Sequence, residues 1–252
     1  MNSLYMDANS SNIAELVIFS GDPWRVDILK NYLDNVQHIA FKREFNTYTG
    51  TYKGVPITVT STGIGSPSAA IAMEEMYECG MKVAVRMGTI MSLEENTLGK
   101  FIIPVATLRR DGTSATYVEQ GYPAVADYDL VTVMNQSVED FGKEHINGIT
   151  ASMDGFYSQM HDSRFSLEKN KNMQVVYTEL KQMGVCGVDM ESSCLLTVGR
   201  LMKVKSVVVT MVTVLENLKA VLSGKERSDA EDLLCRVVLE GLFRYGHIEK
   251  LG

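Results

Sequence analysis

The sequence has no surplus of basic residues. It holds 24 lysines and arginines against 31 aspartates and glutamates, which gives a formal net charge of -7. A protein that binds nucleic acid or an anionic membrane surface needs a basic face, so this balance argues against both kinds of partner. A small anionic substrate is still compatible with it, because such a substrate needs only a few local cations.

Cysteine and histidine are scarce as well. The four cysteines, Cys79, Cys186, Cys194 and Cys235, form no CxxC pair, and the four histidines lie far from one another in the sequence. Metal sites built from these residues have short, recognisable spacings, so we predict no transition-metal site. We expect the thiols to be buried and reduced, as in a cytosolic protein.

Long apolar runs are absent too. No stretch of about 18 apolar residues occurs, so we expect no membrane-spanning segment. Residues 1–12 are polar and lack the basic-then-apolar form of a signal peptide, which leads us to expect a cytoplasmic protein with a loosely ordered start. The length allows one substantial domain or two small ones. Because no repeat and no linker interrupts the pattern, we predict a single domain over 1–252.

Short apolar runs alternate with helical patterns along the chain. Strands are predicted at 16–20, 55–61, 82–85 and 101–106, and the β-branched run 206–215 is typical of a strand buried on both faces. Helices are predicted after Asp22-Pro23, from a Ser66 cap to Gly80, over 190–202, and behind a capping box at 228–231. This alternation predicts an α/β fold with a central, mixed, mostly parallel sheet flanked by helices.

Four segments place an arginine, or a hydroxyl beside a glycine, where a predicted strand ends. They are 20–25 (SGDPWR), 42–45 (KREF), 62–66 (TGIGS) and 86–89 (RMGT). Ligands of such sheets bind at the carboxyl ends of the strands. Helix N-termini attract anions there, and the planar fork of arginine matches phosphate oxygens. We therefore predict a phosphate pocket.

The three arginines of these segments are not equally strong evidence for a phosphate site. Arg25 and Arg43, taken singly, are also explained as surface residues. Arg86 follows the apolar run 82–85, where a charge is costly unless it is paired with an anion or a carboxylate. The three together favour an oxyanion site more strongly than any one of them alone.

Two further segments each allow two interpretations when only the residues are considered. The carboxylates of the segment 188–191 (VDME) could accept hydrogen bonds from the vicinal diol of a ribose, or could be acidic residues favoured at a helix start. The pair Phe156-Tyr157 could stack on a base or belong to the core.

Seven segments in order resemble the nucleoside phosphorylases of the hexameric type, and most closely the uridine phosphorylases. They span nearly the whole chain: 20–25, 43–45, 61–68, 86–89, 122–127, 150–157 and 190–192. The resemblance implies reversible phosphorolysis of a ribonucleoside, with inorganic phosphate as co-substrate and no organic cofactor. It also implies a homo-oligomer, with a dimer as the minimum and a hexamer, a trimer of dimers, as the expected assembly.

The resemblance implies roles for individual residues. The phosphate positions are Gly21, Arg25, Arg86 and Thr89, with Arg43 lent to the site of a neighbouring subunit. The ribose positions are Met190 and Glu191, together with Thr89, and Phe156 forms the wall of the base and sugar pocket. A monovalent cation such as K⁺ is implied at a dimer interface, at Glu44, Ile64 and Ser68.

The base end departs from the family pattern. Met160 and Asp162 stand where uridine phosphorylases have a glutamine and an arginine on the uracil edge, with Gln159 and Arg164 close by in sequence. Met91 replaces a small glycine, and Glu216 replaces a further arginine. Uridine is the first-choice substrate. The alternatives are a purine nucleoside protonated by Glu216, a nucleoside hydrolase, and a homologue that binds a nucleoside without turning it over.

Overall fold

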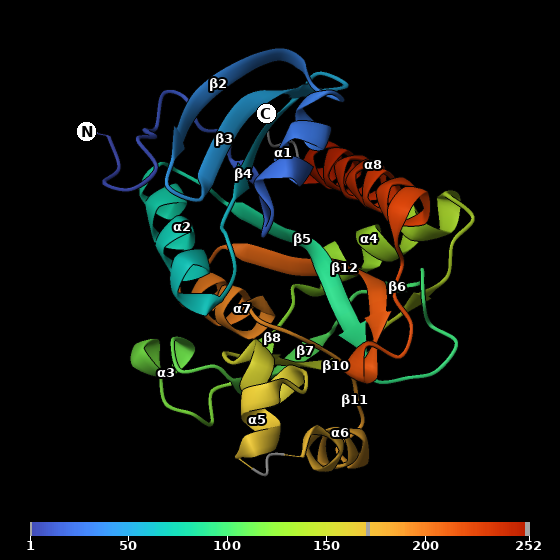
Figure 1. Ribbon diagram of the computed structural model, residues 1–252. Coiled ribbons are helices and arrows are strands. Elements are labelled where there is room, and N and C mark those ends of the chain that lie inside the picture. The colour runs from blue at the N-terminus through green and yellow to red at the C-terminus, as the bar shows by residue number, and fades with distance from the viewer. Residues whose placement is uncertain (1, 170–171, 250–252) are drawn as a thin grey trace.

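The computed structural model describes residues 2–169 and 172–249 (Figure 1). Within them, one mixed sheet of twelve strands forms the centre of the molecule. Its strands are β1 (Leu16–Ser20), β2 (Asp34–Lys42), β3 (Phe45–Tyr52), β4 (Val55–Ser61), β5 (Val83–Ser92), β6 (Phe101–Ile102), β7 (Ala106–Arg110), β8 (Ala124–Val125), β9 (His145–Ile146), β10 (Ile149–Met153), β11 (Val185–Asp189) and β12 (Lys205–Leu215).

Helices connect these strands. They are α1 (Pro23–Lys30), α2 (Ser66–Glu78), α3 (Ser114–Tyr117), α4 (Tyr128–Asp140), α5 (Arg164–Glu168), α6 (Met173–Gln182), α7 (Ser192–Leu201) and α8 (Gly224–Glu249), with a π-helical turn η1 (Phe156–Met160) and a 3₁₀ turn η2 (Glu216–Leu218). Figure 1 shows α4 and α8 together on one side of the long strands β5 and β12, with α2 and α7 on the other. This confirms the α/β class and the helix-flanked mixed sheet.

The long central strand β5 divides the sheet. Over residues 83–87 it pairs in parallel with both β1 and β12. Beyond that point β1 has ended, and β5 continues along β12 and meets β11 in antiparallel register. The sheet therefore opens beside the second half of β5, at the carboxyl end of β1, which is where ligands of such sheets bind.

Alternation along β5 decides which core each side chain enters. Val83, Val85 and Met87 pack with α1, α4 and α8, whereas Ala84 faces the core formed with α2 and α7. Because side chains alternate with a period of two, Arg86 points to the same face as Ala84. The β-branched run in β12 is buried on both faces, as predicted.

Several element boundaries differ from the predictions. The strand expected at 82–85 extends to Ser92, and the strand expected at 101–106 is divided at Pro104, which has no N–H for a sheet ladder. Helix α7 begins at Ser192, two residues after its predicted start, and α8 begins at Gly224. The capping box expected at 228–231 is therefore wrong, because these residues lie inside α8.

The starts of α2 and of the chain also differ from expectation. Ser66 is the first residue of α2 rather than its cap, and its hydroxyl donates to the carbonyl of Met190. The segment 2–12 was expected to be loosely ordered, yet Met6 is fully buried. The backbone N–H groups of Tyr5 and Met6 donate to the carboxylate of Glu75 at 2.7 and 2.8 Å, which ties this segment to α2.

Among the described residues, no helix has the length and apolar character needed to cross a bilayer.

Leu242 tests the packing of α8 on the sheet. This side chain is fully buried in the core shared by α1, α4 and α8. We expect Leu242→Ala to lower the free energy of unfolding by about 2–5 kcal/mol, because it removes apolar contacts and leaves a cavity. Leu167→Ala on α5 is the matched control, since Leu167 is exposed. Urea denaturation measures both, and equal losses in the two variants would contradict this account of the core.

Candidate active site

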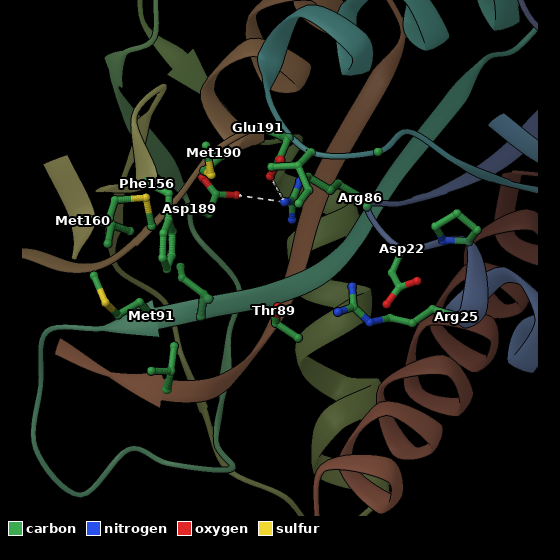
Figure 2. Close-up of a pocket in the computed structure, with 17 residues that line it drawn as sticks. Asp22, Arg25, Arg86, Thr89, Met91, Phe156, Met160, Asp189, Met190 and Glu191 are labelled. Carbon is green, nitrogen blue, oxygen red and sulfur yellow. Dashed lines mark hydrogen bonds and ion pairs between the residues drawn. The ribbon is translucent and has the colours of Figure 1, made fainter. Parts of the chain in front are cut away.

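A pocket of about 620 Å³ opens where the sheet divides (Figure 2). It is lined by residues of β5, η1 and the start of α1, by the ends of β11 and β12, and by the segments that follow β1 and precede α2 and α7. Ten of the predicted site residues line it: Gly21, Arg25, Ile64, Arg86, Thr89, Met91, Phe156, Met160, Met190 and Glu191. Residues distant in sequence thus meet in one cavity.

Arg86 is the buried cation of this pocket, with 6% of its surface exposed. Its Nη2 donates to Glu191 Oε2 and lies 3.4 Å from Asp189 Oδ2. Burial, the largest effect, lowers the pKa of Arg86, but the two carboxylates outweigh it and raise the pKa above its ordinary value. Nη1 is buried and has no hydrogen-bond partner among the described residues.

Gly88 makes room for this arginine. A Cβ at Gly88 would collide with the Arg86 guanidinium, whose Nη1, Cζ and Nη2 are its nearest neighbours. The glycine in the Arg-Met-Gly-Thr segment is therefore required by the arginine two residues before it. A side chain there would displace the cation from the pocket.

Glu191 lies between two helix starts. It is the residue before α7, and its Oε1 accepts a hydrogen bond of 2.6 Å from the N–H of Gly65, the residue before α2. Helix N-termini carry a partial positive charge and unpaired N–H groups, which stabilise a carboxylate in this position. The carboxylate is thereby held in the pocket against Arg86.

Asp189 is a site residue to which the sequence analysis gave no role of its own, beyond counting it among the carboxylates of the segment 188–191. It ends β11, is buried, and accepts hydrogen bonds from the hydroxyl of Ser152 at 2.6 Å and from the N–H of Ser192 at 3.2 Å. The signal was a carboxylate at a strand end, the same signal that marked Glu191. Only the fold shows that Asp189 also faces Arg86.

Arg25 supplies a second cation to the pocket, on the same side as Arg86. It lies in the first turn of α1, whose cap Asp22 accepts from the N–H of Trp24 at 2.9 Å. Its side chain is buried, and its Nε lies 3.2 Å from Glu231 Oε1. Figure 2 shows the Arg25 guanidinium beside Thr89, on the same side of the cavity as Arg86.

The other end of the pocket is apolar. Figure 2 shows Met91, Met160 and Phe156 grouped there, away from Arg25. Ile90, Val188 and Val214 complete this wall. The pocket therefore has a cationic end, a pair of carboxylates in the middle and an apolar end, which suits a ligand with an anionic group, hydroxyls and an aromatic ring.

Comparison with known proteins identifies the family. Residues 15–240 match the model of the phosphorylase superfamily. The chain belongs to this superfamily. The uridine phosphorylase of Escherichia coli is 30% identical over 243 residues, which is 96% of each chain. That of Thermococcus kodakarensis is 38% identical over 191 residues, 75% of this chain and 69% of the relative.

A solved structure extends the likeness to the fold. The uridine phosphorylase from Vibrio fischeri ES114 superposes with a TM-score of 0.84 at 28% identity, covering 96% of this chain and 98% of that one. The resemblance to the uridine phosphorylases within the nucleoside phosphorylases is thereby confirmed.

The phosphorylase pocket does not contain Arg43. This residue lies between β2 and β3 with φ 53°, exposed, and its guanidinium is 5.3 Å from the centre of the Tyr5 ring. Its predicted role in a neighbouring subunit requires it to point outward, which is compatible with this placement. That role stays a prediction.

The three residues of the predicted K⁺ site surround one loop. Ile64 is exposed and lines the pocket, Ser68 Oγ donates to the carbonyl of Gly65 at 3.2 Å, and Glu44 packs on Gly63. Gly63 has φ 69°, and a Cβ there would lie 3.0 Å from Glu44 Cγ, so the glycine permits this approach. The cation itself stays a prediction. Among the described residues, no cluster of histidine, cysteine, aspartate or glutamate is arranged to hold a metal ion.

Four residues expected at the base end do not line the pocket: Gln159, Asp162, Arg164 and Glu216. Gln159 Oε1 accepts from the N–H of Gly155 at 2.9 Å, within the η1 turn. Arg164 starts α5, where its side chain is 94% exposed and pairs with Glu168. Met160 occupies the wall, and the chain then leaves the cavity, which places Asp162 and Arg164 outside it.

Glu216 is engaged elsewhere. Its carboxylate pairs with Lys181 at 2.5 Å and with Lys219. Burial, the largest effect, raises the pKa of Glu216, but the two lysines outweigh it and leave the pKa below its ordinary value. A carboxylate that is ionised at neutral pH and absent from the pocket wall is poorly placed to protonate a purine.

This placement of Glu216 gives a test of the purine alternative. We expect Glu216→Gln to change kcat/KM for uridine and for inosine by less than about threefold, because general-acid roles contribute roughly 10²–10⁴-fold and this residue does not reach the pocket. Glu191→Gln, at a lining residue, is the comparison and should lose more. A selective collapse of inosine cleavage in Glu216→Gln would restore the acid role.

Proposed function

We propose that this protein catalyses the reversible phosphorolysis of a ribonucleoside to a free base and ribose 1-phosphate, with uridine as the first-choice substrate. The observation that carries the proposal is the order of groups along one pocket. Arg25, Arg86 and Thr89 lie at one end, Glu191 lies in the middle, and the wall containing Phe156 and Met160 lies at the other. Phosphate, ribose and base require this order. The enzyme is accordingly a pentosyltransferase.

Phosphate binds at the cationic end. The guanidinium groups of Arg25 and Arg86 supply planar donors for its oxygens, the Thr89 hydroxyl orients it, and Gly21 lets the backbone approach. Glu191 accepts hydrogen bonds from the ribose hydroxyls, with Met190 against the sugar. Breaking the glycosidic bond develops positive charge on the ribose, as in glycoside hydrolysis. The bound phosphate dianion stabilises that charge and then forms the new bond to the sugar.

The charge balance of the pocket supports an oligomer. Arg86 already faces two carboxylates, and Arg25 shares Glu231 with Arg227, so the three arginines and three carboxylates of these two clusters have a formal net charge of zero. An outward-pointing Arg43 from a neighbour would supply a further cation. We therefore propose a dimer as the minimum working unit, a hexamer as the assembly, K⁺ at the dimer interface, and a single-domain cytoplasmic enzyme.

The apolar end holds few groups that could stabilise a leaving base. No charged or amide side chain of the described residues lines the wall formed by Met91, Met160, Phe156 and Val214. Stabilisation of the leaving base must then come from backbone groups, water or the assembled oligomer. The same observation favours a second candidate function, a homologue that binds a nucleoside without cleaving it.

A substrate panel separates the two functions. Uridine, thymidine, inosine and adenosine are incubated with and without phosphate, and free base is measured. The proposed enzyme releases base only when phosphate is present, and a nucleoside hydrolase releases it in either case. A binding protein shows affinity with no release, so absence of release from all four nucleosides would reject the proposed reaction for the common substrates.

Arg86 tests the phosphate assignment. We expect Arg86→Ala to lose phosphate-dependent turnover by roughly 10²–10³-fold, the usual cost of removing a donor that stabilises developing charge. Arg86→Lys keeps the positive charge without the bidentate fork and should recover only part of the rate. The circular dichroism spectrum of each variant controls for folding. Wild-type phosphate dependence in a folded Arg86→Ala variant would remove Arg86 from the site.

A further inference from the structure

Glu231 lies next to the pocket without lining it. It belongs to the second turn of α8, and 18% of its side chain is exposed. Its Oε1 accepts from the Nε of Arg25 at 3.2 Å and from the Nε of Arg227 at 2.7 Å. Glu231 is thus the ion-pair partner of a pocket arginine, contributed by a helix more than two hundred residues further along the chain.

The Glu231 contact orients the Arg25 side chain. The carboxylate engages Nε, at the base of the guanidinium, and leaves the two Nη groups at its outer edge. Figure 2 shows this outer edge directed towards Thr89 inside the cavity. Arginine has a long, flexible side chain, so holding it before the ligand arrives reduces the entropic cost of binding.

The contact does not cancel the charge of Arg25. Arg227 shares the same carboxylate oxygen, so two guanidinium groups share one carboxylate and the trio retains a net positive charge. This arrangement keeps the end of the pocket attractive to an anion while it fixes the arginine. If Glu231 served only to neutralise Arg25, Arg227 would not be needed beside it.

Helix α8 is also the support on which α1 rests. Helix α1 has eight residues, and Tyr32, shortly after its end, donates to Asp232, the neighbour of Glu231. The two polar contacts from adjacent residues of α8 therefore fix both the start and the end of the α1 segment.

We propose that Glu231 is a positioning residue that holds Arg25 in the orientation in which it binds phosphate. The inference rests on the proposed function, in which Arg25 contacts phosphate. It predicts a defect confined to phosphate, because Glu231 lies away from Glu191, Met190 and the apolar wall that serve the nucleoside.

Steady-state kinetics of Glu231→Ala and Glu231→Gln test the inference. We expect the KM for phosphate to rise about three- to tenfold in Glu231→Ala, the cost of ordering one free side chain on binding. The rise should be smaller in Glu231→Gln, which keeps an acceptor oxygen. The KM for uridine and kcat at saturating phosphate should stay within about twofold of the wild type.

Glu240→Gln is the matched control. Glu240 lies on the same helix and pairs with Lys53 at 2.6 Å, away from the pocket. The Glu240→Gln variant should lower thermal stability as much as Glu231→Gln does, and it should leave the KM for phosphate unchanged. If both variants change the kinetic constants in the same way, Glu231 has only a structural role and the inference is overturned. A lower phosphate KM in Glu231→Gln would also overturn it, because the carboxylate would then be repelling the anion.

Direct binding separates this inference from the proposed reaction. Isothermal titration with inorganic phosphate compares the wild type with Glu231→Ala. If no nucleoside is cleaved, the proposed function fails, but a three- to tenfold weaker phosphate affinity in the variant still supports the role of Glu231. Equal affinities overturn it, and a wild type that neither cleaves nucleosides nor binds phosphate overturns both.

Discussion

The site depends on a positive charge that the fold buries and then compensates. Arg86 lies in the middle of β5, where an unpaired guanidinium would be strongly destabilising. Two carboxylates face it, Asp189 at the end of β11 and Glu191 at the start of α7. Arg86 itself lines the cavity. The same ion pairs that make the charge tolerable therefore bring together the cation and the carboxylates that line the pocket.

The pocket is polar where it is held by charges and apolar where it is held by packing. At the cationic end, each arginine is oriented by carboxylates from a distant element: Arg86 by β11 and α7, and Arg25 by α8. At the opposite end, Met91, Met160 and Phe156 belong to or border a hydrophobic cluster. The cationic end is thus built from directional contacts, whereas the apolar end is shaped in part by methionine side chains, which adapt their conformation easily.

Sequence reasoning succeeded where function is encoded locally. Arg25 and Glu191 lie at helix starts that follow β1 and β11, and Arg86 and Thr89 lie in β5 close to the end of β1. Such positions converge at one edge of an α/β sheet. It failed for side chains whose direction depends on tertiary contacts. Glu231 was read as part of a capping box, but α8 begins one turn earlier and the carboxylate meets Arg25 instead.

Hydrophobic alternation, glycine positions and the order of the motifs determined the fold class, the family and most residues of the cationic end of the pocket. These features act over a few residues, so they can be read without a structure. Tertiary structure alone decided that Asp189 and Glu231 support the arginines, that Glu216 pairs with lysines, and that Met160 rather than Gln159 forms the wall. The reason is physical: the partner of a charge, and the direction of a side chain after a turn, are set by elements that are distant in the chain and meet only when the sheet has formed.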